Sequence, residues 1–142
     1  IPLRAYEDLK AFKLFVLDVG LLGCMTGLRQ HTLLDGNDLF VEFKGALTEQ
    51  YVCQQLKTME DLDVYYYTND RGTCEIDFIV DTGTRIIPIE VKAAVNLRAK
   101  SLKVYHEKFS PELSVRTSMT SYRKEDWLVN LPLYAISQLG SL

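Results

Sequence analysis

Residues 75–92 read EIDFIVDTGTRIIPIEVK, and this stretch decides the fold. Segments 74–80 and 85–92 are rich in β-branched and aromatic residues, which favour strands. Between them, segment 81–84 holds Asp, Thr and Gly, a composition typical of a tight turn. We therefore expect an antiparallel hairpin.

Side chains of a strand point alternately to its two faces. Asp77 and the pair Glu90 and Lys92 each lie opposite a fully apolar face. These apolar faces consist of Ile76, Phe78 and Val80 in the first strand, and of Ile87, Ile89 and Val91 in the second. Because the hairpin holds the strands side by side, we expect Asp77, Glu90 and Lys92 to be near neighbours.

A helix is predicted immediately before these strands, over residues 39–59. Glu49 lies within one of its two apolar stripes. A carboxylate at such a position is either at a buried edge or directed into a site. The stripes consist of Phe40, Phe43, Leu47 and Tyr51, and of Gly45, Val52, Leu56 and Met59.

The same periodicities predict the remaining elements. They are a strand over 13–17, a helix from Asp18 through Leu28, a loop over 31–38, a Tyr-rich strand over 64–68, a helix over 96–109, a strand over 113–117, and strand, helix or both over 127–139. The core order is thus helix, three strands, helix, strand. A hairpin followed by a helical crossover implies an α/β fold with a mixed central sheet flanked by helices.

Length and composition fit one ordinary globular domain. The chain has 142 residues, of which 47% are hydrophobic and 25% charged. No apolar run approaches the roughly 20 residues that span a bilayer, so we expect no membrane partner. The three cysteines form no C-x-x-C pair, which is typical of reduced thiols in a cytoplasmic protein. The sequence begins without Met, so we expect a piece of a longer chain.

Charge is distributed unevenly along the chain. Residues 1–84 hold 7 Lys and Arg against 14 Asp and Glu, whereas residues 85–124 hold 9 against 3. The basic part predicts a surface that meets phosphates, with Arg98, Lys100 and Lys103 as candidate nucleic-acid contacts. The alternative is a solvated helix face that happens to be basic.

Three acids and a lysine on one side of a sheet indicate metal-assisted chemistry. Carboxylates are the ligands that Mg²⁺ prefers, and Mn²⁺ is an equivalent candidate. Asp77 and Glu90 would hold the ion, and Glu49 would be a further ligand or an outer base. Lys92 would orient the attacking water or stabilise charge on the phosphate. This set suits hydrolysis of a phosphodiester because no covalent intermediate is required.

The pattern of Asp77 followed by Glu90-Val91-Lys92 resembles the D-x(n)-E-x-K signature of PD-(D/E)XK nucleases. Gly45 and Glu49 resemble the acidic helix that precedes it. Residues 13–22, 75–80, 89–92 and 101–102 are similar to the nuclease-like C-terminal domain of a bacterial and archaeal family. Its members carry an N-terminal AAA+-type P-loop ATPase, and the C-terminal domain has no assigned function. Here Ile76 replaces the Pro that commonly precedes the Asp.

The resemblance implies a restriction-endonuclease-like core over residues 39–142, with residues 1–38 linking to an ATPase domain of the same parent chain. ATP would bind only there, because no G-x-x-x-x-G-K-[ST] motif occurs in this sequence. The resemblance also implies DNA as the partner. Both a monomer and a homo-oligomer are compatible with it. Two alternatives stay open: an inactive module that binds nucleic acid or protein, and a structural domain in which Glu49 and Lys92 form a buried ion pair.

Overall fold

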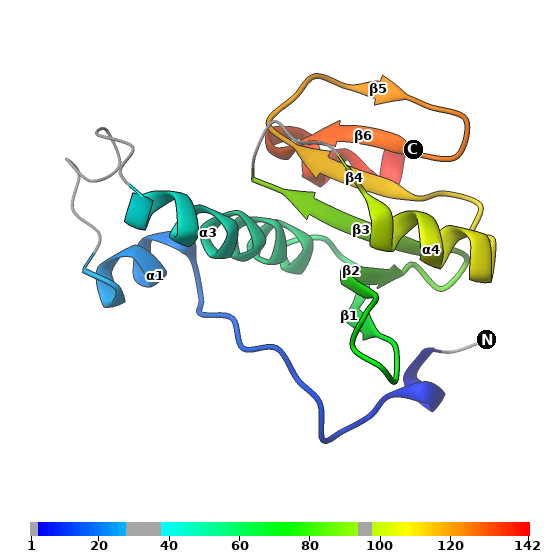
Figure 1. Cartoon of the computed structure of the whole chain (residues 1–142), viewed down its shortest axis with the longest axis horizontal. Helices are drawn as coiled ribbons and strands as arrows, with labels where there is room; N and C mark the ends of the chain where they lie inside the picture. The colour runs from blue at the N-terminus through cyan, green and yellow to red at the C-terminus, as the bar shows by residue number, and fades with distance from the viewer. Residues whose placement is uncertain (1–2, 28–37, 94–97) are drawn as a thin grey trace.

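The computed structural model describes residues 3–27, 38–93 and 98–142, with side chains except those of residues 38–42. Helices precede, separate and follow two runs of three strands each (Figure 1). The helical elements are η1 (Leu3–Tyr6), α1 (Val19–Met25), α3 (Asp38–Lys57), α4 (Lys100–Phe109) and η2 (Leu133–Ser141). The strands are β1 (Asp63–Thr68), β2 (Glu75–Asp81), β3 (Ile86–Lys92), β4 (Val115–Ser118), β5 (Arg123–Lys124) and β6 (Val129–Pro132).

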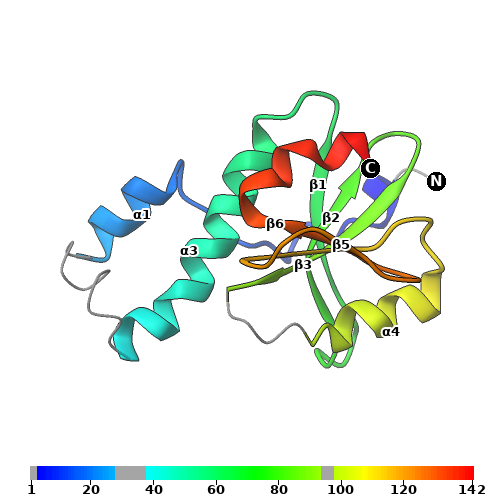
Figure 2. The same cartoon turned by 90° about the horizontal axis from the view of Figure 1, so that it is seen from above.

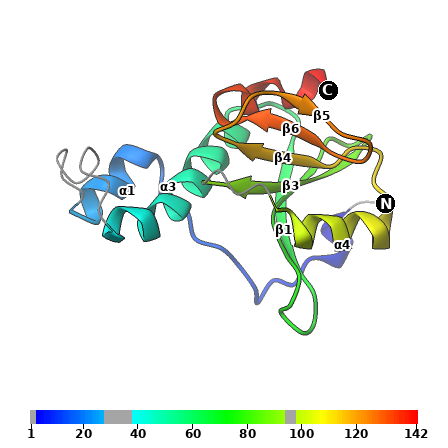
Figure 3. The same ribbon diagram turned by 45° about the horizontal axis from the view of Figure 1, so that its top comes forward.

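All of these strands form one mixed sheet in the order β1-β2-β3-β4-β6-β5. The first three form an antiparallel meander, β3, β4 and β6 run parallel, and β5 returns antiparallel to β6. The succession β3, β4, β6, β5 is visible in Figure 3. The predicted α/β fold with a mixed sheet is confirmed. The two-residue β5 was not predicted, because so short a strand has no periodicity to detect.

Helices cover both faces of the sheet. In Figure 2, α3 and η2 lie on one side of the strands and α4 lies on the other. One apolar core joins α3 and η2 to the sheet, and a second lies beneath α4. Val52 and Leu56 of α3 are completely buried in the first core, as the predicted stripe requires.

The hairpin between β2 and β3 forms as expected. Thr82 N–H donates to the Arg85 carbonyl at 3.0 Å, and Gly83 N–H donates to Asp81 Oδ1 at 2.8 Å. Gly83 has a φ of 77°, which a residue with a Cβ rarely adopts. The turn fixes the register, with Val80 opposite Ile87 and Phe78 opposite Ile89.

Strand β2 contains a bulge that the sequence did not predict. On β1, Tyr65 pairs with Ile79 and Tyr67 pairs with Ile76, so two residues of β2 oppose only Tyr66. The expected common face of Ile76, Phe78 and Val80 is therefore wrong for Ile76. Ile76 is buried in the α4 core with Ile79, whereas Phe78 and Val80 are buried in the α3 core.

The N-terminal region departs further from expectation. Residues 7–17, the N-terminal arm, form neither helix nor strand, so the strand predicted over 13–17 is wrong. Asp18 does cap α1, accepting a hydrogen bond from Leu21 N–H at 2.7 Å. The predicted extension of that helix to residue 28 and most of the loop over 31–38 lie outside the described residues, but Asp38 already belongs to α3.

The last part of the chain confirms the open alternative of strand and helix together, as β6 and η2. Helix α4 begins at Lys100, later than the predicted residue 96, and ends at Phe109 as predicted. Among the described residues, no helix has the length and apolar character needed to cross a membrane.

Candidate functional site

Asp77 lies in the bulge of β2, where the ladder with β3 ends. That ladder runs from Asp81 opposite Ile86 to Phe78 opposite Ile89. One step further, Val91 N–H donates to Asp77 Oδ2 at 2.7 Å. A carboxylate thus replaces the backbone acceptor that a regular ladder would supply. Bulges commonly re-aim a side chain next to a site, and this bulge places the Asp77 carboxylate against the end of β3.

Glu90 joins β3 to the start of α4. Its side chain is buried, and its Oε2 accepts a hydrogen bond from Leu102 N–H at 3.2 Å. Helix α4 has no side-chain cap from its own N-cap residue, Ala99. Glu90 therefore satisfies one of the free amides of the first turn, where a negative charge is also favoured. Lys92 Nζ lies 2.5 Å from Glu90 Oε1 and balances the charge.

Glu49 approaches from α3 on the other side of the hairpin. It is half-buried, and its Oε2 lies 3.8 Å from Lys13 Nζ. Lys13 comes from the N-terminal arm and also lies 2.6 Å from Glu75 Oε1. The structural hypothesis expected Glu49 to pair with Lys92. Instead Glu49 pairs with Lys13, and Lys92 pairs with Glu90.

The pKa of Asp77 depends on the charges of the other predicted acids. Burial raises the pKa of Asp77 from 3.8 to about 6, although the hydrogen bond from Val91 N–H opposes the rise. The negative charges of Glu49 and Glu90 raise the pKa of Asp77 further, whereas Lys13 lowers it. Such interactions require proximity. Glu49, Asp77 and Glu90 therefore form one electrostatically coupled cluster, with Lys92 bound to Glu90.

Lys13 is the site residue that the sequence did not reveal. Burial lowers the pKa of Lys13, but the hydrogen bond to Glu75 and the charges of Glu49 and Asp77 leave it above its usual value. Lys13 is therefore a cation at neutral pH. No local pattern connects it to Glu49, which lies on another element far along the chain.

The donor chemistry of this cluster suits a hard cation, since carboxylate oxygens are its preferred ligands. Among the described side chains, however, no group of three or more His, Cys, Asp or Glu is arranged to hold a metal ion. The acids are engaged instead by Lys13, Lys92 and backbone N–H groups. An ion entering here would have to displace a lysine from an acid.

The predicted nucleic-acid contacts gather at the start of α4. Arg98, Lys100 and Lys103 are all exposed. Lys103 Nζ lies 3.9 Å from Glu107 Oε1 one turn along the helix, a weak surface pair. These cations adjoin Leu102, whose amide binds Glu90, so the basic surface begins beside the acidic cluster.

Arg116 belongs to the basic stretch but not to its surface. It lies opposite Glu90 on β3 and opposite Asn130 on β6, and it is buried. Its Nε donates to Asn130 Oδ1 at 2.9 Å, and its Nη2 lies 3.0 Å from Glu125 Oε1. Arg116 therefore extends the polar row of Glu90 across the sheet instead of facing solvent.

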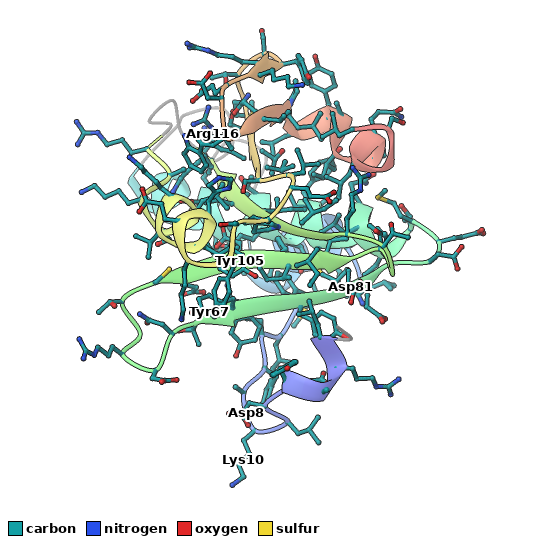
Figure 4. All side chains as sticks on the ribbon, turned by 90° about the vertical axis from the view of Figure 1, so that its right-hand side faces the viewer. Asp8, Lys10, Tyr67, Asp81, Tyr105 and Arg116 are labelled. Carbon is teal, nitrogen blue, oxygen red and sulfur yellow. The ribbon has the colours of Figure 1, made fainter. Side chains whose placement is uncertain are left out.

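Tyr67 of β1 packs against aromatic side chains of α4. Tyr67 packs edge-on against Tyr105 with ring centroids 5.1 Å apart, and against Phe109 at 5.7 Å. Figure 4 shows Tyr67 and Tyr105 side by side between β1 and α4. This packing agrees with the high strand propensity of Tyr.

Fold and site together define an α/β protein with a bulged antiparallel hairpin that carries a cluster of carboxylates and lysines. The model of one family, the domain of unknown function DUF4143, matches residues 44–136. The chain belongs to this family. The match includes Glu49, Asp77, Glu90 and Lys92 and leaves Lys13 outside it. No curated protein and no solved structure matches the chain.

Proposed function

We propose that this domain is a metal-dependent nuclease of the PD-(D/E)XK type that acts on DNA. The observation that supports this most is the convergence of Asp77, Glu90 and Lys92 at the bulged end of one hairpin, coupled to Glu49 on α3. This is the arrangement that the D-x(n)-E-x-K pattern implies, and its residues come from three elements of the fold, β2, β3 and α3.

Asp77 and Glu90 would hold Mg²⁺ or Mn²⁺, with Glu49 as a further ligand or outer base. The ion, when bound, supplies Lewis acidity and a more acidic water. Lys92 is already oriented by Glu90 and would present its ammonium to the attacking water or to the phosphate. The hydrogen bond from Val91 N–H would keep the Asp77 carboxylate in place.

DNA is proposed as substrate from the resemblance and from the exposed cations Arg98, Lys100 and Lys103 beside the cluster. Phosphates are attracted to such a surface but repelled by Asp77 and Glu90 until a cation neutralises them. From the resemblance we also propose an ATPase domain in the same parent chain and a cytoplasmic location.

The second candidate is an inactive module that binds nucleic acid or a protein partner. One observation favours it: Glu49 and Glu90 are already paired with lysines, and Asp77 with a backbone amide. In such a module these contacts would hold the hairpin, α3 and α4 together instead of holding a metal ion.

Plasmid cleavage tests the proposal directly. Wild-type protein with Mg²⁺ or Mn²⁺ should nick supercoiled plasmid, whereas Asp77→Asn and Lys92→Met should reduce the rate at least about a hundredfold. Lys57→Met, which removes an exposed lysine at the end of α3, is the control and should cleave normally. Intact plasmid with wild type, together with binding of labelled DNA, would favour the second candidate.

A further inference from the structure

The first part of the chain carries most of the apolar surface that faces solvent. Among the described residues, seven of the twelve exposed large apolar side chains belong to η1, the N-terminal arm and α1. Figure 1 shows this segment running along the outside of the domain from η1 to α1. The seven side chains are those of Tyr6, Leu9, Phe12, Leu14, Leu17, Leu21 and Met25.

The area of this apolar surface is close to that of one side of a stable interface. Its seven side chains are between 43% and 86% exposed. At roughly 100–150 Å² of apolar surface for each large side chain, they present on the order of 700 Å². A standard protein interface buries about 800 Å² on each partner, whereas soluble monomers rarely expose an apolar patch larger than a few hundred Å². The segment therefore has the size of an interface.

The backbone of the arm has one occupied edge and one open edge. Gln50 of α3 is almost completely buried, and its side-chain amide takes the place of a neighbouring strand. Val16 N–H donates to Gln50 Oε1 at 3.0 Å, and Gln50 Nε2 donates to the Val16 carbonyl at 2.8 Å. No described residue bonds the backbone of Lys13, Phe15 or Leu17. Because successive residues of an extended chain direct their backbone groups to opposite edges, the edge away from α3 is free to pair.

The side chains of the arm also alternate as they do in a strand. Lys13 pairs with acids of the domain, and Phe15 packs on Phe78 with ring centroids 5.7 Å apart. Phe12 and Leu14 alternate with them and are 70% and 86% exposed. This is the period of two that a strand has. The segment thus combines strand propensity and strand geometry, but it has no strand beside it.

The charges of the arm are complementary to those of a second copy of the same segment. Lys10 and Asp18 lie four residues before and four residues after Leu14. Neither forms an ion pair with any residue that the structure describes. In an antiparallel pairing centred on Leu14, Lys10 of each copy would lie opposite Asp18 of the other copy. The same register brings the exposed Tyr6 of one copy toward α1 of the other, where Met25 is exposed.

We propose that the N-terminal arm forms a symmetric dimer with a second copy of this chain, in which residues 12–16 of the two arms pair as antiparallel strands about Leu14. A two-fold interface uses the same surface of both copies. The backbone groups of Lys13 would bond those of Phe15 across the axis. A cavity of about 260 Å³ beside Leu14, lined mainly by apolar side chains of the arm, α1 and α3, gives room to apolar side chains of the second copy.

This inference goes beyond the proposed nuclease activity and does not depend on it. It needs no metal ion or DNA, and the open edges of the central sheet take no part in the pairing. It can therefore fail while the proposed function stands, and the proposed function can fail while the dimer stands.

Sedimentation velocity of the whole chain, from about 1 to 100 μM, tests the dimer. Wild type should be dimeric at the upper concentrations. Leu14→Asp places two carboxylates at the two-fold axis and should weaken dimerisation at least about a hundredfold. Because Leu14 is 86% exposed in the single chain, this variant should still fold. Tyr134→Asp makes the same kind of change at a side chain that is 81% exposed on η2, and it should dimerise as wild type does.

Disulfide formation tests the register of the two arms in a chain that carries Cys24→Ser. Leu14→Cys should give a covalent dimer on oxidation, because directly opposite residues of a non-hydrogen-bonded pair have Cα atoms about 4.5 Å apart, within the range of a disulfide. Leu17→Cys is similarly exposed, but its two copies would lie about 20 Å apart and should not be linked.

Each outcome decides the matter. A wild-type chain that is monomeric at the highest concentration overturns the proposal, and so does a dimer that Leu14→Asp leaves intact or that Tyr134→Asp also disrupts. If Leu14→Asp does not fold, linkage of Leu14→Cys without linkage of Leu17→Cys supports the proposal. Equal linkage of both cysteine variants, or of neither, overturns it.

Discussion

Replacing Asp77 with Asn should stabilise the metal-free protein at neutral pH. The buried carboxylate has its pKa raised from 3.8 to about 6, so its ionised form is less favourable in the folded chain than in the unfolded chain. One pKa unit corresponds to about 1.4 kcal/mol, and a shift of about two units therefore corresponds to about 3 kcal/mol. Partial exposure of Asp77 screens part of this, so we expect a gain of about 2 kcal/mol.

The size of this stabilisation depends on pH in a defined way. Between pH 4 and pH 6 the folded state holds the Asp77 proton more firmly than the unfolded state does. The contribution of Asp77 to stability therefore falls as pH rises through this window, and the loss is complete above pH 7. Asn does not ionise, and its side-chain oxygen can still accept the hydrogen bond from Val91 N–H. The advantage of Asn should be near zero at pH 3 and greatest above pH 7.

Urea unfolding in the presence of EDTA, at intervals from pH 3 to pH 8, measures this difference. Asp70→Asn, in the exposed turn between β1 and β2, is the matched control and should show little dependence on pH. A difference between wild type and Asp77→Asn that stays constant with pH would refute the reasoning. So would an Asp77→Asn protein that is less stable than wild type at pH 8.

Two further predictions concern the DNA surface and the attachment of the arm. If Arg98, Lys100 and Lys103 each contact one phosphate, the log–log salt dependence of DNA binding should have a slope of about −3, and each Ala substitution should reduce it by about one. Salt-independent binding, or a triple variant that binds as wild type does, would contradict this. The side-chain amide of Gln50 forms hydrogen bonds with both the N–H and the carbonyl of Val16 in the N-terminal arm. Gln50→Ala removes both hydrogen bonds and should lower the free energy of unfolding in urea by about 1–3 kcal/mol. It should also make residues 3–19 sensitive to trypsin, whereas Gln55→Ala should do neither.

The hairpin is the part of the fold that could be predicted most fully from the sequence. Alternation with period two and the turn chemistry are local, so they revealed β2, β3 and the approach of Asp77 to Glu90. The face of Ile76 was wrong because a bulge depends on how the partner strand pairs. Nothing within β2 itself indicates that two of its residues face only Tyr66.

The site was predictable only in part, for a related reason. Segment 14–17 is apolar and includes Phe15 and Val16, but the backbone groups of Val16 bond the side chain of Gln50 instead of a neighbouring strand. Tertiary contacts thus override its strand propensity. Lys13, which meets Glu49 and Glu75, lies three residues before this attachment. Arg116 is one of the basic residues of segment 85–124, but the partners that accompany its burial, Asn130 and Glu125, lie on later segments.

The bulge at Asp77 also bears on how the protein avoids self-association. Strand β1 is an open edge of the sheet, and such an edge can template pairing with another chain. A bulge in the adjacent strand increases the local twist and bends the ladder, so the edge is turned away from the flat geometry that intermolecular pairing needs. At the opposite edge, β5 is only two residues long, and both of them are basic. The distortion that aims a carboxylate into the site thus also protects one border of the sheet against aggregation.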